Sequence, residues 1–371
     1  MIAMGITIRE IAERLSVSEA TVSRSLRNDP VINPATRARV NQFAVSVGYQ
    51  GPSRRPRAAR NPATRLARDE AKALGAGAQS IAVLLAVAEM SYAHRFGNIV
   101  RILQGITAEM DRAGVQQALR MIAPEGVANV RPGSADLPII LDTPGLAGII
   151  LEGRSSADFV AQAAKSVPVV TLARRYEDTF SDTVLSDNVY GIATLVERLA
   201  DLGHERFAFV EDEAIDTFGE ERYAGFLIGC ARRGIDATRQ RVIKREALVW
   251  FGLEIRLDRD ALAEALAPPQ PTAFVCMNDR AAWRLLAACR QFGLSAPDQI
   301  SVTGFDNDVL TQIDGVSRDT SLTTIDPNFT EMGRYAVRMV LQRNARPDTP
   351  PLRTVVPYTF IPGSTIGPPP R

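Results

Sequence analysis

The chain of 371 residues contains few histidines, few cysteines and no long apolar run. Its two histidines and three cysteines are far apart in the sequence: His94, His204, Cys230, Cys276 and Cys289. This spacing argues against a metal cluster, and each cysteine falls within an apolar pattern that predicts a buried free thiol. The longest apolar stretch, residues 81–88, is about half as long as a bilayer requires. We therefore expect no membrane span, no metal and no cofactor.

Signatures of the common enzyme classes are also missing. The sequence has no Gly-x-Ser-x-Gly, no Walker loop and no histidine beside a candidate nucleophile. Near the start, the charged residues Arg9, Glu10 and Glu13 interrupt the apolar core that a secretory signal would need. These absences predict a cytoplasmic protein that is not an enzyme.

Charge is unevenly distributed along the chain. The formal net charge is +1, yet residues 1–75 carry 13 Lys and Arg against 6 Asp and Glu, and the remaining residues carry 30 against 36. A basic head on an acidic body suggests that the head binds a polyanion. A merely solvated basic segment would also explain the count, so the decision rests on the motif in the head.

Three short helices are predicted within residues 1–50. Residues 7–15 place four apolar side chains on one helical face and begin with a Thr-x-x-Glu capping box. After a short corner, Ser18 can cap a second helix. A third helix begins at Asn33, has Pro34 in its first turn and stops at Gly48. We expect these helices to share a small trihelical core.

The second helix, SVSEATVSRSL over residues 16–26, has only a narrow apolar stripe. Its polarity is explained if it belongs to a helix-turn-helix, in which the second helix lies in the major groove of DNA. Ser, Thr and Arg suit phosphate oxygens and guanine, Glu can accept from a cytosine amine, and Ala can contact a thymine methyl. The candidate DNA-binding residues of this helix are Ser18, Glu19, Ala20, Thr21, Ser23 and Arg24. For Glu19, a surface carboxylate favoured by the helix N-terminus is an equal alternative.

The stretch ITIREIAERLSVSEATVSRSLRNDPVINPATRARVNQFAVSVGY resembles the headpiece of the lactose/galactose repressor family of bacterial transcription regulators. The pattern VSxxTVSRxL, followed by TRxxV and GY, carries the resemblance, which has no gap over residues 7–49. The resemblance implies that Glu19, Ala20 and Arg24 occupy base-reading positions. Near the DNA backbone it places Thr7, Thr21, Ser23 and Tyr49.

The linker over residues 51–79 departs from the family pattern. In the family, a hinge with a PNxxARxL pattern folds into a helix on operator DNA and inserts a leucine into the minor groove. The matching stretch here is GPSRRPRAAR, in which the leucine position falls on Ala58 and Pro56 would interrupt a helix. Leu66, in a later capped stretch, is one substitute. The alternative, which we favour, is a flexible basic tether that attracts phosphates through Arg54, Arg55 and the neighbouring arginines.

From residue 80 onward, short apolar runs alternate with helical patterns. Solid runs of Val, Ile, Leu and Ala are typical of parallel sheets covered by helices on both faces. With stretches such as RYAGF, ISVTGFDN and LTTIDPNF, the pattern resembles the family's regulatory domain, which has two subdomains and is similar to periplasmic sugar-binding proteins. The predicted fold class is therefore α/β with parallel sheets, preceded by an all-α helix-turn-helix headpiece.

The predicted domains are the headpiece over residues 1–50, the linker over 51–79, and an effector-binding and dimerisation domain over 80–371. Within the last, we expect subdomain 1 to comprise about residues 80–201 and 322–350, and subdomain 2 about residues 202–321 and 351–366. The chain should cross between them near residue 201, near residue 321 and before the strand in TVVPYTFI.

Candidate effector-binding residues follow the strands, because such sheets bind ligands beyond the carboxyl ends of their strands. Arg222 and Asp306 can each make paired hydrogen bonds to adjacent hydroxyls of a polyhydroxylated ligand. The resemblance favours both residues, together with Asn278, as ligand contacts. Asp279 and Asp187 could equally cap the helices that follow them.

Aromatic side chains and one loop complete the predicted effector site. Phe329 or Trp250 could cover the apolar face of a sugar ring. The loop after the first strand, where such sites vary with the ligand, contributes His94, Arg95 and Phe96.

Together these features predict a sequence-specific transcription regulator, a repressor, that binds double-stranded operator DNA as a homodimer or a tetramer. A small-molecule effector is expected to control it. A sugar is the expected effector, and a purine, a nucleoside or a phosphorylated metabolite is the alternative. A solute receptor that does not bind DNA is a further alternative, against which the helix-turn-helix argues.

Overall fold

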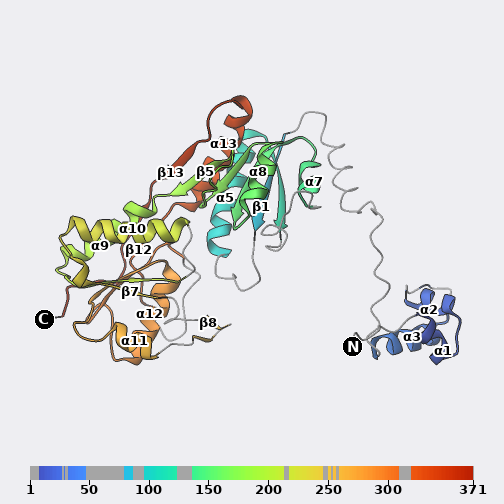
Figure 1. Ribbon diagram of the computed structural model, residues 1–371, viewed down its shortest axis with the longest axis horizontal. Helices are drawn as coiled ribbons and strands as arrows, with labels where there is room; N and C mark the ends of the chain where they lie inside the picture. Colours follow the sequence, from blue (N-terminus) through green and yellow to red (C-terminus); the bar gives the residue numbers. More distant parts are fainter. Residues whose placement is uncertain are drawn as a thin grey trace. The chain divides into compact units, whose positions relative to one another are not determined.

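The structure, a computed structural model, has two compact units, Met1–Glu70 and Ala71–Arg371 (Figure 1). It describes residues 8–26, 29, 32–46, 79–86, 96–122, 136–212, 217–244, 250–251, 254–255, 259–308 and 319–370. The first unit contains the N-terminal helices and the second contains two α/β lobes.

The N-terminal unit has the three predicted helices: α1 (Ile8–Leu15), α2 (Glu19–Leu26) and α3 (Pro34–Ser46). Apolar side chains from all three helices form one buried cluster: Ile11, Ala12, Val22, Val40 and Ala44. The Ser18 hydroxyl accepts a hydrogen bond from the Thr21 backbone N–H at 3.1 Å and so caps the start of α2. This confirms the predicted trihelical headpiece.

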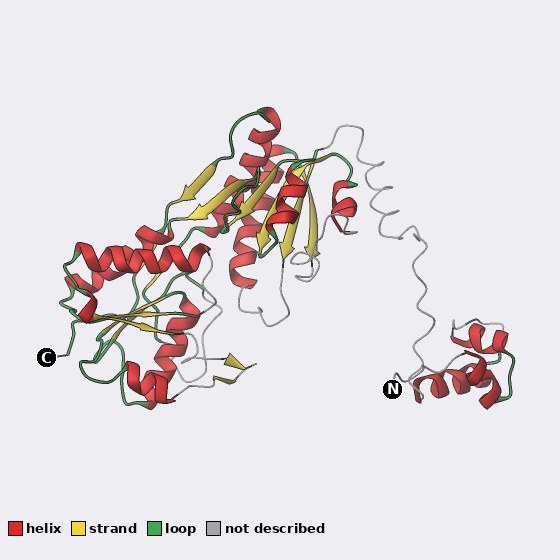
Figure 2. Ribbon diagram, viewed as in Figure 1, coloured by secondary structure: helices red, strands yellow, loops and turns green. Residues whose placement is uncertain are grey.

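Lobe 1 is built on a parallel sheet with strand order β13-β5-β4-β3-β1-β2. Its strands are β1 (Ser80–Ala86), β2 (Gln116–Ile122), β3 (Leu146–Gly153), β4 (Val169–Leu172), β5 (Asp182–Ser186) and β13 (Arg353–Val356). Side chains alternate between its faces. Ile81 and Val83 pack under α5 (Phe96–Ala113) and α13 (Phe329–Ala345), whereas Ala82 and Leu84 pack under α7 (Asp136–Leu141) and α8 (Ala157–Ala164) (Figure 2). Burial on both faces explains why the inner strands β1, β3 and β4 are mostly apolar.

Lobe 2 repeats this design on a smaller parallel sheet, with strand order β11-β10-β6-β7. Its strands are β6 (Phe207–Val210), β7 (Gln240–Ile243), β10 (Ala273–Cys276) and β11 (Ser301–Thr303). One face is covered by α9 (Asn188–Asp201) and α10 (Thr217–Arg232), and the other by α11 (Arg259–Ala265) and α12 (Asp279–Gln291). Short antiparallel pairs are formed by β8 (Trp250–Phe251) with β9 (Glu254–Ile255), and by β12 (Thr324–Asp326) with β14 (Thr359–Ile361). Together, the two lobes confirm the predicted α/β fold class.

The three crossings between the lobes fall at different places from those predicted. Helix α9 packs on β6 in lobe 2, so the first crossing lies near Asp187 rather than near residue 201. The second follows β12, at residues 327–328, a few residues beyond the expected position. Strand β13 pairs with β5 in lobe 1, so the third crossing follows the first strand of TVVPYTFI instead of preceding it. Hydrophobic periodicity marks buried elements but does not say which sheet each joins.

All three cysteines are buried free thiols, as predicted. Burial raises the pKa of Cys230 and of Cys289 to about 12. His204 is also buried, and its Nδ1 lies 2.8 Å from the Thr272 hydroxyl oxygen while its Nε2 lies 2.9 Å from the Gly367 carbonyl oxygen. These contacts give His204 a structural role in fixing the C-terminal segment. Among the described residues, no helix is both long and apolar enough to cross a membrane.

Candidate functional site

Helix α2 presents the polar surface that was predicted from its sequence. Val22 and Ser25 are buried, whereas Glu19, Ala20 and Arg24 are exposed, and Ser23 is partly exposed. The three base-reading candidates therefore share the accessible side of the helix, as a recognition helix requires.

The other headpiece candidates divide into two groups. Ser18 and Thr21 are partly engaged within the cap, where their hydroxyl oxygens lie 2.8 Å apart, so each retains only part of its hydrogen-bonding capacity for DNA. The second group, which lies outside the described residues, comprises Thr7, Tyr49, Arg54 and Arg55. Their roles, and the choice between hinge and tether, stay predictions.

A cleft lies at the carboxyl ends of the strands of both lobes. Its apolar wall is formed by Ile99, Ile102, Leu172, Phe218 and Phe329, and it contains about 820 Å³ of space that is partly continuous with solvent. Parallel sheets collect ligands at this edge, because the chain leaves each strand there and exposes loop side chains and helix N-termini.

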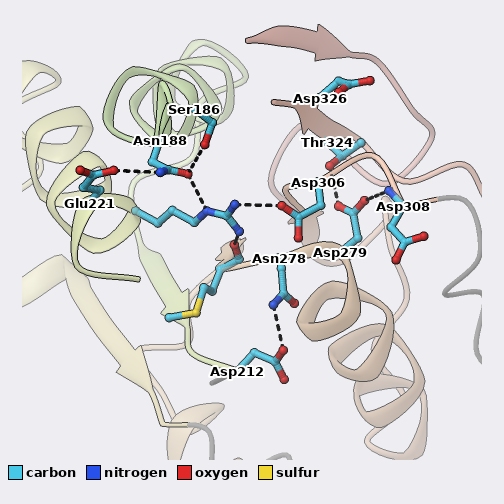
Figure 3. Close-up of polar contacts among 12 residues, drawn as sticks. Ser186, Asn188, Asp212, Glu221, Asn278, Asp279, Asp306, Asp308, Thr324 and Asp326 are labelled. Carbon is cyan, nitrogen blue, oxygen red and sulfur yellow. Dashed lines mark hydrogen bonds and ion pairs between the residues drawn. The ribbon is translucent and has the colours of Figure 1, made fainter. Parts of the chain in front are cut away.

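Arg222 lines the polar side of this cleft, and its partners Asn188 and Asp306 are labelled in Figure 3. It lies on α10, and its side chain is only 5% exposed. Nη2 donates to Asp306 Oδ1 at 2.8 Å, Nε to Asn188 Oδ1 at 3.0 Å and Nη1 to the Met277 carbonyl at 2.8 Å. The guanidinium carbon also lies 3.9 Å from the ring centroid of Phe305. Among the described residues, these bonds use three of the five N–H groups of Arg222, so two donors can still reach a ligand.

Asn188 extends this network into lobe 1. Its Oδ1 accepts from Ser186 Oγ at 3.0 Å as well as from Arg222, and its Nδ2 donates to Glu221 Oε2 at 2.9 Å. Because all these groups are already hydrogen-bonded, the predicted pair of Arg222 and Asp306 is held in a fixed orientation.

Asn278, the third predicted contact, is anchored by two hydrogen bonds. Its Oδ1 accepts from the Ala281 backbone N–H at 2.8 Å, so Asn278 rather than Asp279 caps α12. Its Nδ2 donates to Asp212 Oδ2 at 2.8 Å. The Asp212 side chain is 1% exposed and also forms ion pairs with Arg280 and Arg284, whose side chains are 9% and 8% exposed. Asn278 therefore lines the cleft from the edge of a buried ionic network.

Asp279 lies behind this polar side of the cleft. Its carboxylate accepts from the Asp308 backbone N–H at 2.7 Å and from the Thr324 hydroxyl at 2.5 Å. Burial, and secondly the charge of Asp306, raises the pKa of Asp279 to about 7. Gly304 makes this arrangement possible, since a Cβ atom there would lie 2.1 Å from Asp279 Oδ1. The cleft is thus lined by a carboxyl group whose pKa burial raises above its ordinary value.

The remaining predicted effector residues are only partly located by the structure. Phe329 begins α13 and lines the cleft. Phe96 begins α5 and Trp250 begins β8, but their side chains lie outside the described part of the chain. His94 and Arg95 lie outside the described residues altogether. Asp187 caps α9 by accepting a hydrogen bond from the Tyr190 backbone N–H at 3.2 Å. This is the helix-capping role that was the alternative to a ligand contact.

Several residues of the cleft were not predicted from the sequence. They include Asn98 at the start of α5, Arg174 after β4 and Phe218 on α10. The Oδ1 atom of Asn98 is buried and has no hydrogen-bond partner among the described residues. The position of Arg174 shortly after an apolar strand could have indicated a residue of the cleft. Every strand of a parallel sheet ends in this way, so the position alone does not distinguish Arg174 from residues after the other strands.

Comparisons with known proteins agree with this architecture. The profile of the bacterial regulatory proteins of the lacI family matches residues 7–51, and that of the periplasmic binding protein-like domain matches residues 196–366. This chain belongs to the lacI family of bacterial regulatory proteins. It is a DNA-binding transcription regulator and not an enzyme.

Two relatives illustrate the breadth of the match to this lacI-family chain. The HTH-type transcriptional repressor CytR of Escherichia coli K12 is 27% identical over 91% of this chain and 89% of its own length. The arabinose metabolism transcriptional repressor of Geobacillus stearothermophilus is 30% identical over 53% of this chain, which spans 54% of that relative's length.

Solved structures of lacI-family regulators share the fold. The transcriptional regulator CelR in complex with cellobiose is 19% identical, covers 97% of this chain and 99% of its own, and gives a TM-score of 0.60. The lac repressor dimer bound to operator and an anti-inducer is 20% identical, covers 98% of this chain and 99% of its own, and gives a TM-score of 0.59.

Proposed function

We propose that this lacI-family regulator is a repressor that binds operator DNA as a homodimer and is controlled by a sugar bound in the cleft. The observation that carries the effector assignment is the ion pair of buried Arg222 and half-buried Asp306, whose Nη2 and Oδ1 atoms lie 2.8 Å apart, with the Arg222 guanidinium over the ring of Phe218. Charged groups fixed by their own hydrogen bonds can bind adjacent hydroxyls, while aromatic and aliphatic side chains cover the C–H face of a sugar.

The proposed roles of the three polar residues follow from their bonds. Arg222 has two N–H groups left to donate, Asp306 supplies a carboxylate, and Asn278 is oriented by its cap and by Asp212. Two similar proteins, the regulator CelR in complex with cellobiose and an arabinose metabolism repressor, support a carbohydrate as the effector class.

The proposed operator contact is made by α2. Glu19, Ala20 and Arg24 would read bases from its exposed side, and one headpiece per chain contacts too few bases for useful specificity. We therefore propose two heads on a near-palindromic site, since two-fold protein symmetry matches two half-sites. Footprinting should protect two symmetric half-sites; protection of one unpaired half-site would contradict the dimer.

The effector proposal is tested by ligand binding to matched variants. A thermal-shift screen of neutral sugars, nucleosides and sugar phosphates identifies the class, and calorimetry then measures affinity for wild type, Asp306→Ala and Arg222→Ala. We expect Asp306→Ala to lose roughly 2 kcal/mol or more of binding free energy, because the ligand hydroxyls lose a desolvated partner. The control is Asp201→Asn, an exposed carboxylate of the same lobe.

The possible results separate the alternatives. Unchanged sugar affinity in both cleft variants would place the site elsewhere. Tight binding of a nucleoside or a sugar phosphate, but of no neutral sugar, would replace the effector class while leaving the regulator itself intact.

A further inference from the structure

One side chain of lobe 1 reaches across to the proposed effector contact in lobe 2. Arg101, on α5, donates from Nη2 to the backbone carbonyl of Asp306 at 2.6 Å and from Nη1 to Asp326 Oδ2 at 3.1 Å. Its guanidinium carbon lies 4.9 Å from the ring centroid of Phe329. The side chains of Arg101 and Asp326 are 25% and 19% exposed, so this contact is largely shielded from water.

The backbone that Arg101 holds is in an uncommon conformation. Asp306 has φ +113° and Asn307 has φ +50°, a region that L side chains rarely adopt. Asp326 supports the same turn, because its Oδ2 also accepts from Asn307 Nδ2 at 3.0 Å and its Oδ1 accepts from the Asn328 backbone N–H at 2.7 Å. Such conformations persist only where surrounding contacts enforce them. Arg101 and Asp326 are two of those contacts.

The turn at residues 306–307 is therefore held from both sides. The Asp306 carboxylate faces Arg222 in the cleft, while the carbonyl of the same residue accepts from Arg101 of the other lobe. Figure 3 shows Asp306 between the Arg222 network and Asp326, which lies beyond Thr324 on β12. A change in the spacing of the lobes would act directly on the residue proposed to bind the effector.

We propose that Arg101 is a positioning residue that fixes the 306–307 turn and couples effector binding at Asp306 to the arrangement of the two lobes. The coupling part rests on the proposed function, since it takes Asp306 as an effector contact. The bonds of Arg101 exist only in arrangements that keep α5 within hydrogen-bonding distance of the turn, so they favour those arrangements over others. By linkage, effector binding and lobe arrangement then influence each other by the same factor.

The positioning part can be tested without any ligand, by hydrogen exchange on the full chain. The Asp306 N–H donates to the Ile325 carbonyl at 2.8 Å and the Asp308 N–H donates to Asp279, so the amides of the turn report on its opening. The test variant is Arg101→Gln. The matched control is Arg112→Gln, which removes the same charge from the same helix but, within the described part of the chain, breaks only a contact with Glu109 in lobe 1.

In Arg101→Gln we expect amide exchange at residues 304–308 and 324–328 to accelerate by about tenfold, the equivalent of one lost hydrogen bond to a charged group. The control should exchange like wild type in these segments. Unchanged exchange in the turn of Arg101→Gln, or equal acceleration throughout the chain, would overturn the positioning role.

The coupling part is tested with a neutral sugar that binds wild type in the thermal-shift screen. In Arg101→Gln, sugar affinity should fall about tenfold, and the ratio of operator affinities with and without sugar should move toward one. Arg101→Lys keeps the charge beside Asp326 and should restore part of the sugar affinity and part of the operator response. If Arg101→Gln kept the wild-type sugar affinity and the wild-type ratio of operator affinities, the coupling would be overturned. If no sugar binds wild type, the proposed effector class fails instead, and the exchange experiment decides the role of Arg101 alone.

Discussion

Replacing Asp212 by Asn tests whether the ionic network beneath the cleft supports lobe 2. The Asp212 side chain is 1% exposed and accepts from Arg280 Nε at 2.6 Å, Arg284 Nη1 at 2.5 Å and Asn278 Nδ2 at 2.8 Å. Removing its charge leaves two buried guanidinium groups beside a neutral amide. Breaking a buried ion pair in this way typically costs about 3–5 kcal/mol. Both arginines also have further interactions, so we expect a loss near 3 kcal/mol, at the lower end of that range.

Urea unfolding followed by tryptophan fluorescence is a suitable assay, because Trp283 lies on α12 within the same lobe. Asp212→Asn should lower the midpoint of unfolding, whereas Asp201→Asn, which breaks an exposed pair with Arg233, should change stability by less than about 1 kcal/mol. Asn278 also exchanges a charged acceptor for a neutral one in Asp212→Asn, so effector affinity should fall with stability. A loss below about 1 kcal/mol in Asp212→Asn would refute the reasoning, because it would mean that the two arginines remain compensated without the carboxylate.

Three further predictions concern the headpiece, the linker and pH. Arg24→Ala should weaken operator binding by about 1–3 kcal/mol and relax specificity at one base position, whereas Arg14→Ala on α1 should not relax it; gel shifts on selected and mutated sites measure this. Changing the linker residues Arg54, Arg55, Arg57 and Arg60 to Gln should weaken binding to all DNA. It should also reduce the slope of log affinity against log salt concentration by up to about four. Loss of specific binding alone would instead indicate an ordered hinge. Because the pKa of Asp279 is raised from 3.8 to about 7, the folded protein retains a proton that the unfolded chain releases in this range. The free energy of unfolding should therefore fall as pH rises through it, by up to about 1.4 kcal/mol per unit. Asp279→Asn should flatten that part of the stability curve, and an unchanged curve would contradict the raised pKa.

The headpiece could be predicted almost completely from the sequence, because its information is local. The cap at Ser18 and the apolar positions of α1 and α2 lie within a few residues of one another, and the structure places them as expected. Ser25 was not singled out from the sequence; it is fully buried, and its hydroxyl has no hydrogen-bond partner among the described residues.

The alternation of strands and helices was sufficient to predict the parallel sheets and the edge at which the cleft lies, and Arg222 and Asp306 were expected to face each other there. The other contacts within the cleft were not predicted: Asn188 bonds to Arg222 over 34 residues, and Asn278 bonds to Asp212 over 66. No periodicity encodes such pairings, since they depend on how two sheets are placed around three crossings. For the same reason, α9 was assigned to the wrong lobe and the contribution of Arg101 was not foreseen.

Operator binding measured with and without effector, in wild type and Asp306→Asn, tests the central claim most directly. The operator is obtained by selection from random-sequence DNA, and the effector is the sugar that stabilises wild type in the thermal-shift screen. We predict that the sugar changes operator affinity in wild type, and that Asp306→Asn binds the operator like wild type without sugar but no longer responds to it at the same concentration. A full sugar response in Asp306→Asn, or an operator affinity in wild type that no cleft ligand alters, would contradict the account.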